Sequence, residues 1–440
     1  MKTAASILFA FRMLIPKHKT PSNARKSMAG AVLCVALSLI PLVVVLVVAD
    51  GMIEGITDRI VGLSSYHIQI EHRNNRMQVS SAIEELTDIS KQMRELNGVI
   101  SASAEVQGVA LGSGKKGRAG ITVRAVESSV FNDNNAFKTY FSLIQGTMSL
   151  DGGKNALIGE KTAKNLGVSA GDSFYIISSS VSAAGSVIPK LSIFKVAGVI
   201  SSGYQELDSL WVFIPLEYAF DVFSLSNVQM IVGLETKSPF TEEIFDVYNA
   251  VDDVLPLTDT AYMWNELNTA QYENYASTKM LLLLVMFLIV LVASVNVSSA
   301  LVMLVMERRK EIAILKSVGA SGSGISISFL IIGTCIGGLG VIAGIPLGLL
   351  CAVNVNEIII LFEKIVNFFM YFVYSIIEKE GYKAIQVLDP EFYLAKVPVT
   401  VPFIELFLIA CVTMCLSLAV SLFPAIRAGK EKPLSILRKV

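Results

Sequence analysis

Four long apolar stretches constrain this chain more than any other feature. They cover residues 27–49, 280–306, 325–353 and 402–426, and Glu405 is the only charged residue in them. An α-helix needs about 20 apolar residues to cross the hydrocarbon core of a bilayer. The sequence therefore predicts an α-helical membrane protein with four transmembrane helices.

Basic residues lie before the first predicted span, after the second and after the fourth. They are Lys2, Arg12, Lys17, Lys19, Arg25 and Lys26, then Arg308, Arg309, Lys310 and Lys316, then Arg427, Lys430, Lys432, Arg438 and Lys439. Four spans place these flanks on one side of the membrane, and the positive-inside rule makes that side the cytoplasm. We therefore expect the N-terminal segment 1–26 and the tail 427–440 to be cytoplasmic.

Two further apolar segments need an interpretation. Segment 1–26 has a stripe formed by Ile7, Leu8, Phe11, Leu14 and Ile15, which is typical of an interfacial helix or a simple membrane anchor. Residues 358–377 are a rival fifth span, but Glu363 and Lys364 interrupt it and leave too short an uncharged remainder. We interpret it as an interfacial or extracytoplasmic helix within the loop 354–401.

The region between the first two spans, residues 50–279, is long enough to bury a core of its own. Its alternating segments and turn clusters predict a mixed α/β (α+β) extracytoplasmic domain. We expect strands at 121–126, 173–177, 191–200, 210–214 and 228–234, and helices at 79–97, 160–166 and 241–251.

Both membrane helices that border this domain are predicted to continue beyond the bilayer. Ile53, Ile56, Ile60 and Leu63 keep helical spacing after the first span. From about residue 260 the pattern is helical up to the second span, without a Gly or Pro. Two helical stalks could therefore link membrane and domain mechanically.

Composition excludes several functional classes. The chain is 53% hydrophobic and 17% charged, with a net charge of -1, so no overall field attracts nucleic acid. All five cysteines lie in the apolar stretches, which argues against a disulfide framework. Three histidines leave little material for a metal site or a catalytic triad. We predict no catalytic, cofactor-binding or metal-binding residue.

One glycine-rich segment imitates a nucleotide-binding loop. Residues 112–116 read GSGKK. The Walker A pattern needs Gly at position 109 and Ser or Thr at position 116, where this chain has Val109 and Lys116. We therefore expect a surface turn here and no phosphate site.

The strongest local pattern follows the second span, in the loop 307–324. Residues 306–321 read MERRKEIAILKSVGAS, a basic flank followed by an amphipathic turn with Ile312, Ile314 and Leu315. A basic flank alone could serve topology only. The amphipathic turn favours a short helix on the membrane face that docks in a groove of a partner.

This segment resembles the cytoplasmic loop of ABC-transporter permeases of the FtsX, MacB and Lol type. GMIEGITDRIVGLSSYHIQI, ALIGEKTAKNLGVSAGDSF and the terminal LFPAIRAGKEKPLSILRKV resemble the Lol permeases in the same order. Within this group, the chain resembles the lipoprotein-releasing permeases LolC and LolE. The resemblance implies a non-catalytic, multi-pass protein of the bacterial inner membrane that extracts lipoproteins and passes them to a periplasmic carrier.

The resemblance also implies partners and sites. ATP and Mg would bind a separate LolD-like ATPase, and a second permease would complete a homodimer or a LolC/LolE-like heterodimer. The coupling residues would be Glu307, Arg308, Lys310, Glu311, Ile312, Ala313, Ile314, Leu315, Lys316, Gly319, Ala320 and Ser321. A LolA-like carrier would bind the loop 178–190 through Val187, Ile188 and Pro189, although a plain Ser/Gly-rich hairpin loop explains that sequence equally well.

A substrate cavity between the first two spans is the remaining hypothesis. Its wall would be formed by Leu39, Pro41, Val44, Val48, Ile289, Val292 and Asn296. Simple helix packing or lipid contact is the competing interpretation. Two other functions stay open: a MacB-like exporter of peptides or amphiphiles, and an FtsX-like mechanotransmitter that regulates a periplasmic cell-wall hydrolase.

Overall fold

The computed structural model divides the chain into two compact units. The helical unit comprises Met1–Gly51, Tyr275–Lys383 and Val397–Val440, and the α/β unit comprises Met52–Asn274 and Ala384–Lys396. The structure describes residues 10, 23–73, 79–181, 187–256, 258–377 and 398–431. The apolar stripe predicted in segment 1–26 and most of the tail 427–440 lie outside these residues.

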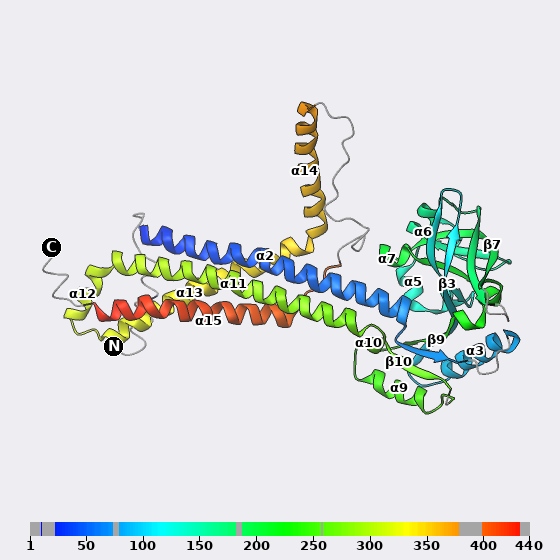
Figure 1. The fold of residues 1–440 in the computed structure, drawn as a ribbon. Helices are drawn as coiled ribbons and strands as arrows, with labels where there is room; N and C mark the ends of the chain where they lie inside the picture. Colours follow the sequence, from blue (N-terminus) through cyan, green and yellow to red (C-terminus); the bar gives the residue numbers. More distant parts are fainter. Residues whose placement is uncertain are drawn as a thin grey trace. The chain divides into compact units, whose positions relative to one another are not determined.

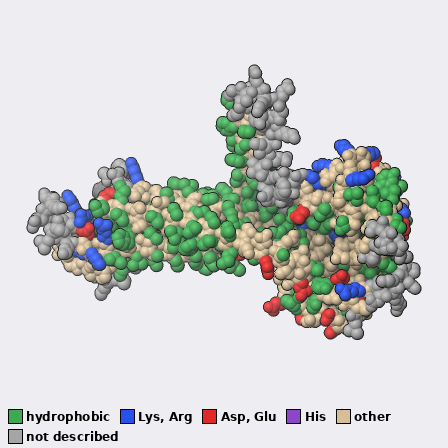
Figure 2. All heavy atoms as spheres, viewed as in Figure 1, with side chains coloured by type: hydrophobic (Ala, Val, Ile, Leu, Met, Phe, Trp, Pro, Cys, Tyr) green, Lys and Arg blue, Asp and Glu red, His purple; other side chains and the backbone are tan. Residues whose placement is uncertain are grey.

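Among the residues that the structure describes, four helices are long and apolar enough to cross a membrane (Figure 1). They are α2 (Asn23–Arg59), α11 (Thr269–Glu307), α13 (Gly322–Val353) and α15 (Phe403–Lys430). Their number agrees with the four predicted spans. Hydrophobic side chains cover the sides of these helices (Figure 2), and the five cysteines on them are free thiols.

Small residues bring α13 close to two neighbouring helices. A Cβ atom at Gly333 or Gly337 would collide with Ser421 or Ser417 of α15. On another face of α13, the missing side chain of Gly348 makes room for Val43 of α2, 2.7 Å from where a Cβ would lie. Close backbone approach increases van der Waals contact, which holds helices together in lipid, where apolar burial gives little driving force.

The loop after α13 contains a further helix, α14 (Val355–Ile377). It begins directly after Asn354, the C-cap of α13. Its position agrees with the helix predicted at 358–377. Residues 378–397 of the predicted loop 354–401 lie outside the described part of the chain.

The predicted stalk of the first span is confirmed. Helix α2 runs on to Arg59 and is followed by a π-helical segment, η1 (Ile60–Ser65). The second span is also extended by helix, because α11 begins at Thr269, but the predicted helix does not run unbroken from residue 260. Residues Thr260–Met263 form strand β10, and a short helix α10 (Trp264–Leu267) precedes α11.

Tertiary pairing explains this error. Ala261 and Tyr262 of β10 pair with Ile70 and Gln69 of strand β1 (Ile68–His72), far away in the sequence. Glu266 then starts the helix, because its carboxylate accepts a hydrogen bond from the Met263 N–H at 2.9 Å. Local helical spacing does not report such a distant partner.

The α/β unit is built on one ten-stranded sheet with the order β10-β1-β9-β2-β3-β8-β5-β7-β4. The other strands are β2 (Val99–Ser113), β3 (Arg118–Val126), β4 (Ser142–Gly146), β5 (Asn155–Gly159), β6 (Ser173–Val181), β7 (Val187–Ser201), β8 (Trp211–Pro215) and β9 (Gln229–Thr236). Strand β6 pairs with both β2 and β7, so β2, β3, β8, β5, β7 and β6 form a closed ring. All five predicted strands are present.

Helices cover both sides of the sheet. One side packs against α3 (Val79–Arg94), α6 (Glu160–Leu166), α8 (Ala219–Val222) and α9 (Glu243–Asp252). The other packs against η1, α4 (Val130–Asp133) and α5 (Asn135–Tyr140) around an aromatic core. Helix α7 (Gln205–Asp208) connects β7 to β8.

Candidate functional site

The predicted coupling segment forms a short helix, α12 (Arg309–Ser317), between α11 and α13. Gly319, with φ +99, ends it: the Ala320 N–H donates to the Leu315 carbonyl and the Gly319 N–H to the Lys316 carbonyl. This left-handed glycine termination satisfies the last carbonyls of the helix. Ser321 then caps α13 by accepting a hydrogen bond from Gly324 N at 3.2 Å.

Helix α12 has an inner and an outer face. Ile312 and Ala313 are buried in the core of the helical unit. Lys310, Glu311 and Ile314 are exposed, and Ile314 keeps 55% of its surface accessible. The predicted coupling residues therefore lie on two faces of α12, with Ile312 and Ala313 buried on the inner face and Lys310, Glu311 and Ile314 exposed on the outer face.

Two basic residues of the segment hold α12 to the end of α15. The Lys316 ammonium donates to the carbonyls of Gly429 and, at 2.7 Å, Glu431, and Arg309 forms an ion pair of 2.9 Å with Glu431. Cations are favourable at a helix C-terminus, where the carbonyls are unsatisfied. Lys316 was predicted as a coupling residue, but the structure gives it this internal role.

The remaining members of the coupling set lie at the ends of α12. Arg308 pairs with Glu311 at 2.5 Å, Glu307 is exposed, and Leu315 and Ala320 are half-buried. Basic side chains gather at the α12 end of the helical unit (Figure 2). The outer face of α12 is thus a charged surface with one large apolar side chain, Ile314.

The predicted cavity wall is not assembled within one chain. Leu39 is buried and packs against α13 at Gly344. Pro41 of α2 is exposed, and Val44 and Val48 are half-buried. On α11, the three predicted residues Ile289, Val292 and Asn296 are all exposed. Leu39 is thus buried among the helices of its own chain, whereas the three α11 residues are exposed.

The predicted carrier loop 178–190 is mostly strand. Strands β6 and β7 pair through Ser178 with Lys190, Ser179 with Pro189, Ser180 with Ile188 and Val181 with Val187. The hairpin is longer than predicted, because the ladder continues through Ser178, Ser179 and Ser180 to Val181. Residues 182–186 lie outside the described chain, and Ile188 and Pro189 are exposed.

One face of this hairpin is apolar and exposed. Tyr175 and Ile193 are paired neighbours on it, next to Leu191 and to Leu111 of β2. Such side chains are normally turned into a core. The face is therefore a second candidate surface for a protein partner.

A buried ionic cluster, which sequence reasoning missed, fixes the end of the first stalk. Arg124 is 1% exposed and binds Glu105 through two nitrogens, at 2.5 and 2.7 Å. It also donates to the Leu63 carbonyl of η1, and the Tyr66 hydroxyl donates to Glu105 at 2.7 Å. The sequence offers no signal for this cluster, because its members lie far apart along the chain.

The charges inside the cluster compensate each other. Burial alone lowers the pKa of Arg124, but Glu105 and Tyr66 outweigh it and raise that pKa. Burial and Glu105 raise the pKa of Tyr66 well above its usual value, so the phenol stays neutral. The guanidinium also lies 4.6 Å from the Trp211 ring centre, a cation–π distance. The cluster therefore attaches η1 to the sheet.

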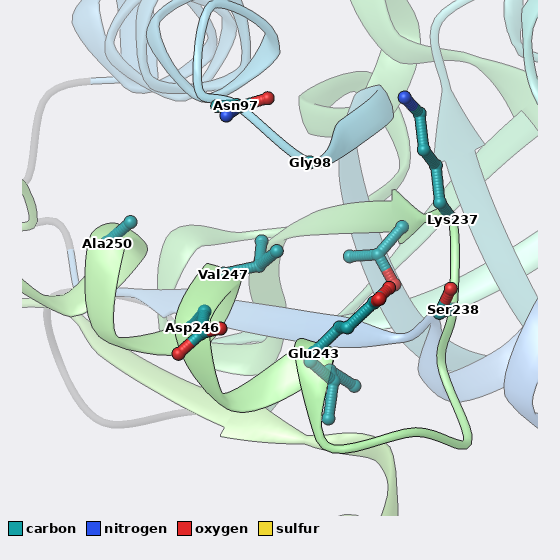
Figure 3. Close-up of a pocket in the computed structure, with 10 residues that line it drawn as sticks. Asn97, Gly98, Lys237, Ser238, Glu243, Asp246, Val247 and Ala250 are labelled. Carbon is teal, nitrogen blue, oxygen red and sulfur yellow. The ribbon is translucent and has the colours of Figure 1, made fainter.

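An open pocket of about 340 Å³ lies beside α9 (Figure 3). The turn at Asn97 and Gly98, the end of β9 with Lys237, and Glu243 and Asp246 of α9 line it. Both carboxylates are exposed to water. Among the described residues, no group of three or more His, Cys, Asp or Glu could hold a metal ion.

Comparison with known families gives two matches that extend over both units. The MacB-like periplasmic core domain matches residues 28–242, and the FtsX-like permease C-terminal region matches residues 283–433. The chain therefore combines a MacB-like periplasmic core domain with an FtsX-like permease region, and the described part of the chain has four apolar helices, a short helix between the second and third, and an α/β unit between the first and second.

The curated relatives narrow this class. The chain is 25% identical over 415 residues to the lipoprotein-releasing system transmembrane protein LolC of Neisseria meningitidis serogroup B, covering 92% of both chains. It is 25% identical over 236 residues to LolE of Haemophilus influenzae, covering 53% of this chain and 52% of LolE. The chain is thus similar to a Lol-type permease over almost its whole length, and four apolar helices among its described residues indicate a multi-pass membrane protein.

Among solved structures, the periplasmic region of MacB from Actinobacillus actinomycetemcomitans is similar to 48% of this chain. The match covers 95% of that structure, with a TM-score of 0.31 and 9% sequence identity.

Proposed function

We propose that this chain is the permease subunit of an ABC transporter that extracts lipoproteins from the inner membrane and passes them to a periplasmic carrier. The observation that carries this proposal is the LolC match, because it extends over 92% of both chains and therefore includes both units. Both termini are cytoplasmic in this proposal, which follows from the basic flanks of the spans.

Lipoprotein release needs an external energy source. Burial in the bilayer stabilises an acyl chain by about 0.8 kcal/mol per methylene, so three chains with ~45 methylenes are held by roughly 30 kcal/mol or more. A separate ATPase supplies that energy in the proposal, with ATP and Mg bound there. A soluble carrier with an apolar cavity then accepts the chains.

Helix α12 is the proposed coupling element. Its outer face presents Lys310, Glu311 and Ile314 to the ATPase, while Arg309 and Lys316 tie it to the end of α15. Movement imposed on the outer face is thereby passed to α15. Because α13 and α15 pack through glycines and serines, both helices respond together.

A second permease completes the proposed substrate cavity. Pro41 on α2 and Ile289, Val292 and Asn296 on α11 are exposed, so they can face another subunit. Asn296 brings an amide into an otherwise apolar helix face, and polar residues in membrane helices usually face a protein interior or interface. The partner is a second copy or a related permease of the LolC/LolE pair.

The β6–β7 hairpin is the proposed carrier site. Ile188 and Pro189 are exposed near its tip, and the apolar face with Tyr175 and Leu191 continues from it. A soluble lipid carrier offers apolar surface of its own, so this face would be covered on docking.

Reconstitution tests the proposal. The complex is purified through this chain and placed in liposomes with a lipoprotein, and ATP-dependent transfer to a soluble carrier is measured. Ile314→Glu should abolish transfer because it puts a buried charge in the ATPase contact, whereas Ile314→Leu should retain it.

The outcomes separate the competing functions. ATP hydrolysis without transfer of any lipoprotein would overturn the cargo assignment. Export of a peptide or amphiphile would then favour the MacB-like alternative, and recovery of a cell-wall hydrolase on the α/β unit would favour the FtsX-like one.

A further inference from the structure

Helix α14 exposes more large apolar side chains than a water-exposed helix normally does. Phe368 and Phe369 keep 69% and 62% of their surfaces accessible, and Phe372 keeps 60%. Exposed apolar patches of this kind mark a contact with a protein or a membrane. The functional proposal for the permease assigns no role to this helix.

The side chains of α14 separate into two faces at helical spacing. Around the apolar face lie Ile358, Leu361, Phe362, Ile365, Phe368, Phe369 and Phe372, all of them exposed. The opposite face carries Asn356, Glu357, Glu363, Lys364 and Asn367, together with Ile360 and Tyr371. A helix with a large apolar arc and a charged arc is suited to the boundary between water and acyl chains.

We propose that α14 is an interfacial helix that lies in the outer leaflet of the membrane, with its phenylalanine face among the acyl chains. The lipid is favoured as the occupant because α14 continues a surface that already faces lipid. Leu347, Leu350 and Val353 on the last turns of α13 are exposed, and α14 starts only one residue later. Helix α15 returns the chain to the membrane at Phe403.

The charges of α14 favour the interface over a transmembrane path. Glu363 and Lys364 lie in the middle of the helix, where a bilayer core would have to accommodate both. A fifth crossing would also move the basic flank after α15 away from the cytoplasm. With only Lys364 against Glu357 and Glu363, the helix has no polybasic attraction to anionic lipids. Its insertion should therefore be insensitive to salt.

Two adjacent positions test the orientation. In the full-length chain with its native cysteines replaced by alanine, Ile365→Cys and Lys364→Cys each receive a bimane fluorophore. The variants are placed in phosphatidylcholine vesicles that carry nitroxides either near the headgroup or at the end of the acyl chain. Retention of a single peak in size-exclusion chromatography checks that each variant folds.

The expected result is a blue-shifted emission at position 365, quenched most by the nitroxide near the headgroup and protected from aqueous iodide. The label at position 364 should be open to iodide, and neither result should change with salt. Equal iodide quenching at both positions would overturn the proposal and place α14 in water. Strongest quenching by the chain-end nitroxide would also overturn it and indicate a fifth span. Protection of position 365 that requires the partner permease would assign the face to a protein interface instead.

Discussion

Arg124 shows how much one residue can contribute to the α/β unit. Its guanidinium neutralises a buried carboxylate and holds a carbonyl of η1. Arg124→Met should destabilise this unit by about 3–5 kcal/mol, because Glu105 is left buried without its cation. Urea unfolding followed by the fluorescence of the nearby Trp211 measures the loss.

A double variant is the control. Arg124→Met combined with Glu105→Leu removes both charges, so it should recover much of the lost stability. If the double variant is as unstable as the single one, the damage comes from lost packing or from the Leu63 bond, and the ionic account is wrong.

His67 gives the α/β unit a dependence on pH. Burial lowers the pKa of this imidazole below its usual 6.5, partly opposed by Glu235. Its Nδ1 accepts a hydrogen bond from the Thr236 N–H at 2.8 Å, which requires the neutral ring. The unfolded chain binds the proton more readily, so stability is full above pH 6.5 and is lost as the pH falls towards the lowered pKa.

The variant His67→Asn tests this dependence. The side-chain carbonyl of Asn can accept the Thr236 bond and does not titrate. Urea midpoints measured across the acidic range should fall less steeply for the variant than for the wild type. Parallel curves would mean that other groups cause the pH dependence.

At the scale of elements, the contact between α13 and α15 depends on missing side chains. Gly337→Ala places a methyl group against Ser417 and should cost about 1–3 kcal/mol. Gly338→Ala, one residue further, meets no atom within 4 Å and should be neutral or stabilise by about 0.5–1 kcal/mol. Thermal unfolding of the detergent-solubilised chain distinguishes the two, and equal midpoints would contradict the packing account.

Elements with a strong local pattern could be predicted from the sequence. The four spans follow from long uncharged stretches, and α6 has the predicted limits because its amphipathic turn ends at Gly167, whose φ is +68. Strands β1, β2, β4, β5 and β10 were not predicted, and distant partners stabilise them, as β9 and β10 do for β1.

In the candidate site, too, the local pattern could be predicted from the sequence and the contacts with distant residues could not. The existence of α12 is visible in the sequence, but its inner and outer faces are not, because they depend on where α15 ends. Lys316 looks like any basic residue of a cytoplasmic flank until the carbonyls of Gly429 and Glu431 are placed next to it.

At the scale of the whole molecule, the structure describes two helical connections between the units, α2, which crosses at Gly51, and α11, which crosses at Tyr275. The first runs as continuous helix through α2 into η1, where Arg124 holds it. The second crosses as continuous helix too, but α11 begins inside the α/β unit at Thr269, directly after Asn268, whose φ of -122 is not helical. Force should therefore travel mainly through the first connection.

Matched insertions test this difference. Two glycines inserted after Ile56 should reduce lipoprotein transfer strongly while ATP hydrolysis continues, because a flexible break in a helix absorbs displacement. The same insertion after Asn268 should have a smaller effect. Equal loss of transfer from both sites would show that both connections carry the load.

The pairing of β1 with β10 brings the two ends of the α/β unit together. The strand that enters the α/β unit and the strand that leaves it are hydrogen-bonded neighbours, with Ile68 beside Met263. Neighbouring antiparallel residues are only about 5 Å apart, and domains with adjacent ends are readily inserted into a host chain. We therefore expect that the α/β unit can be replaced by that of another permease without a change in the order of the four membrane helices.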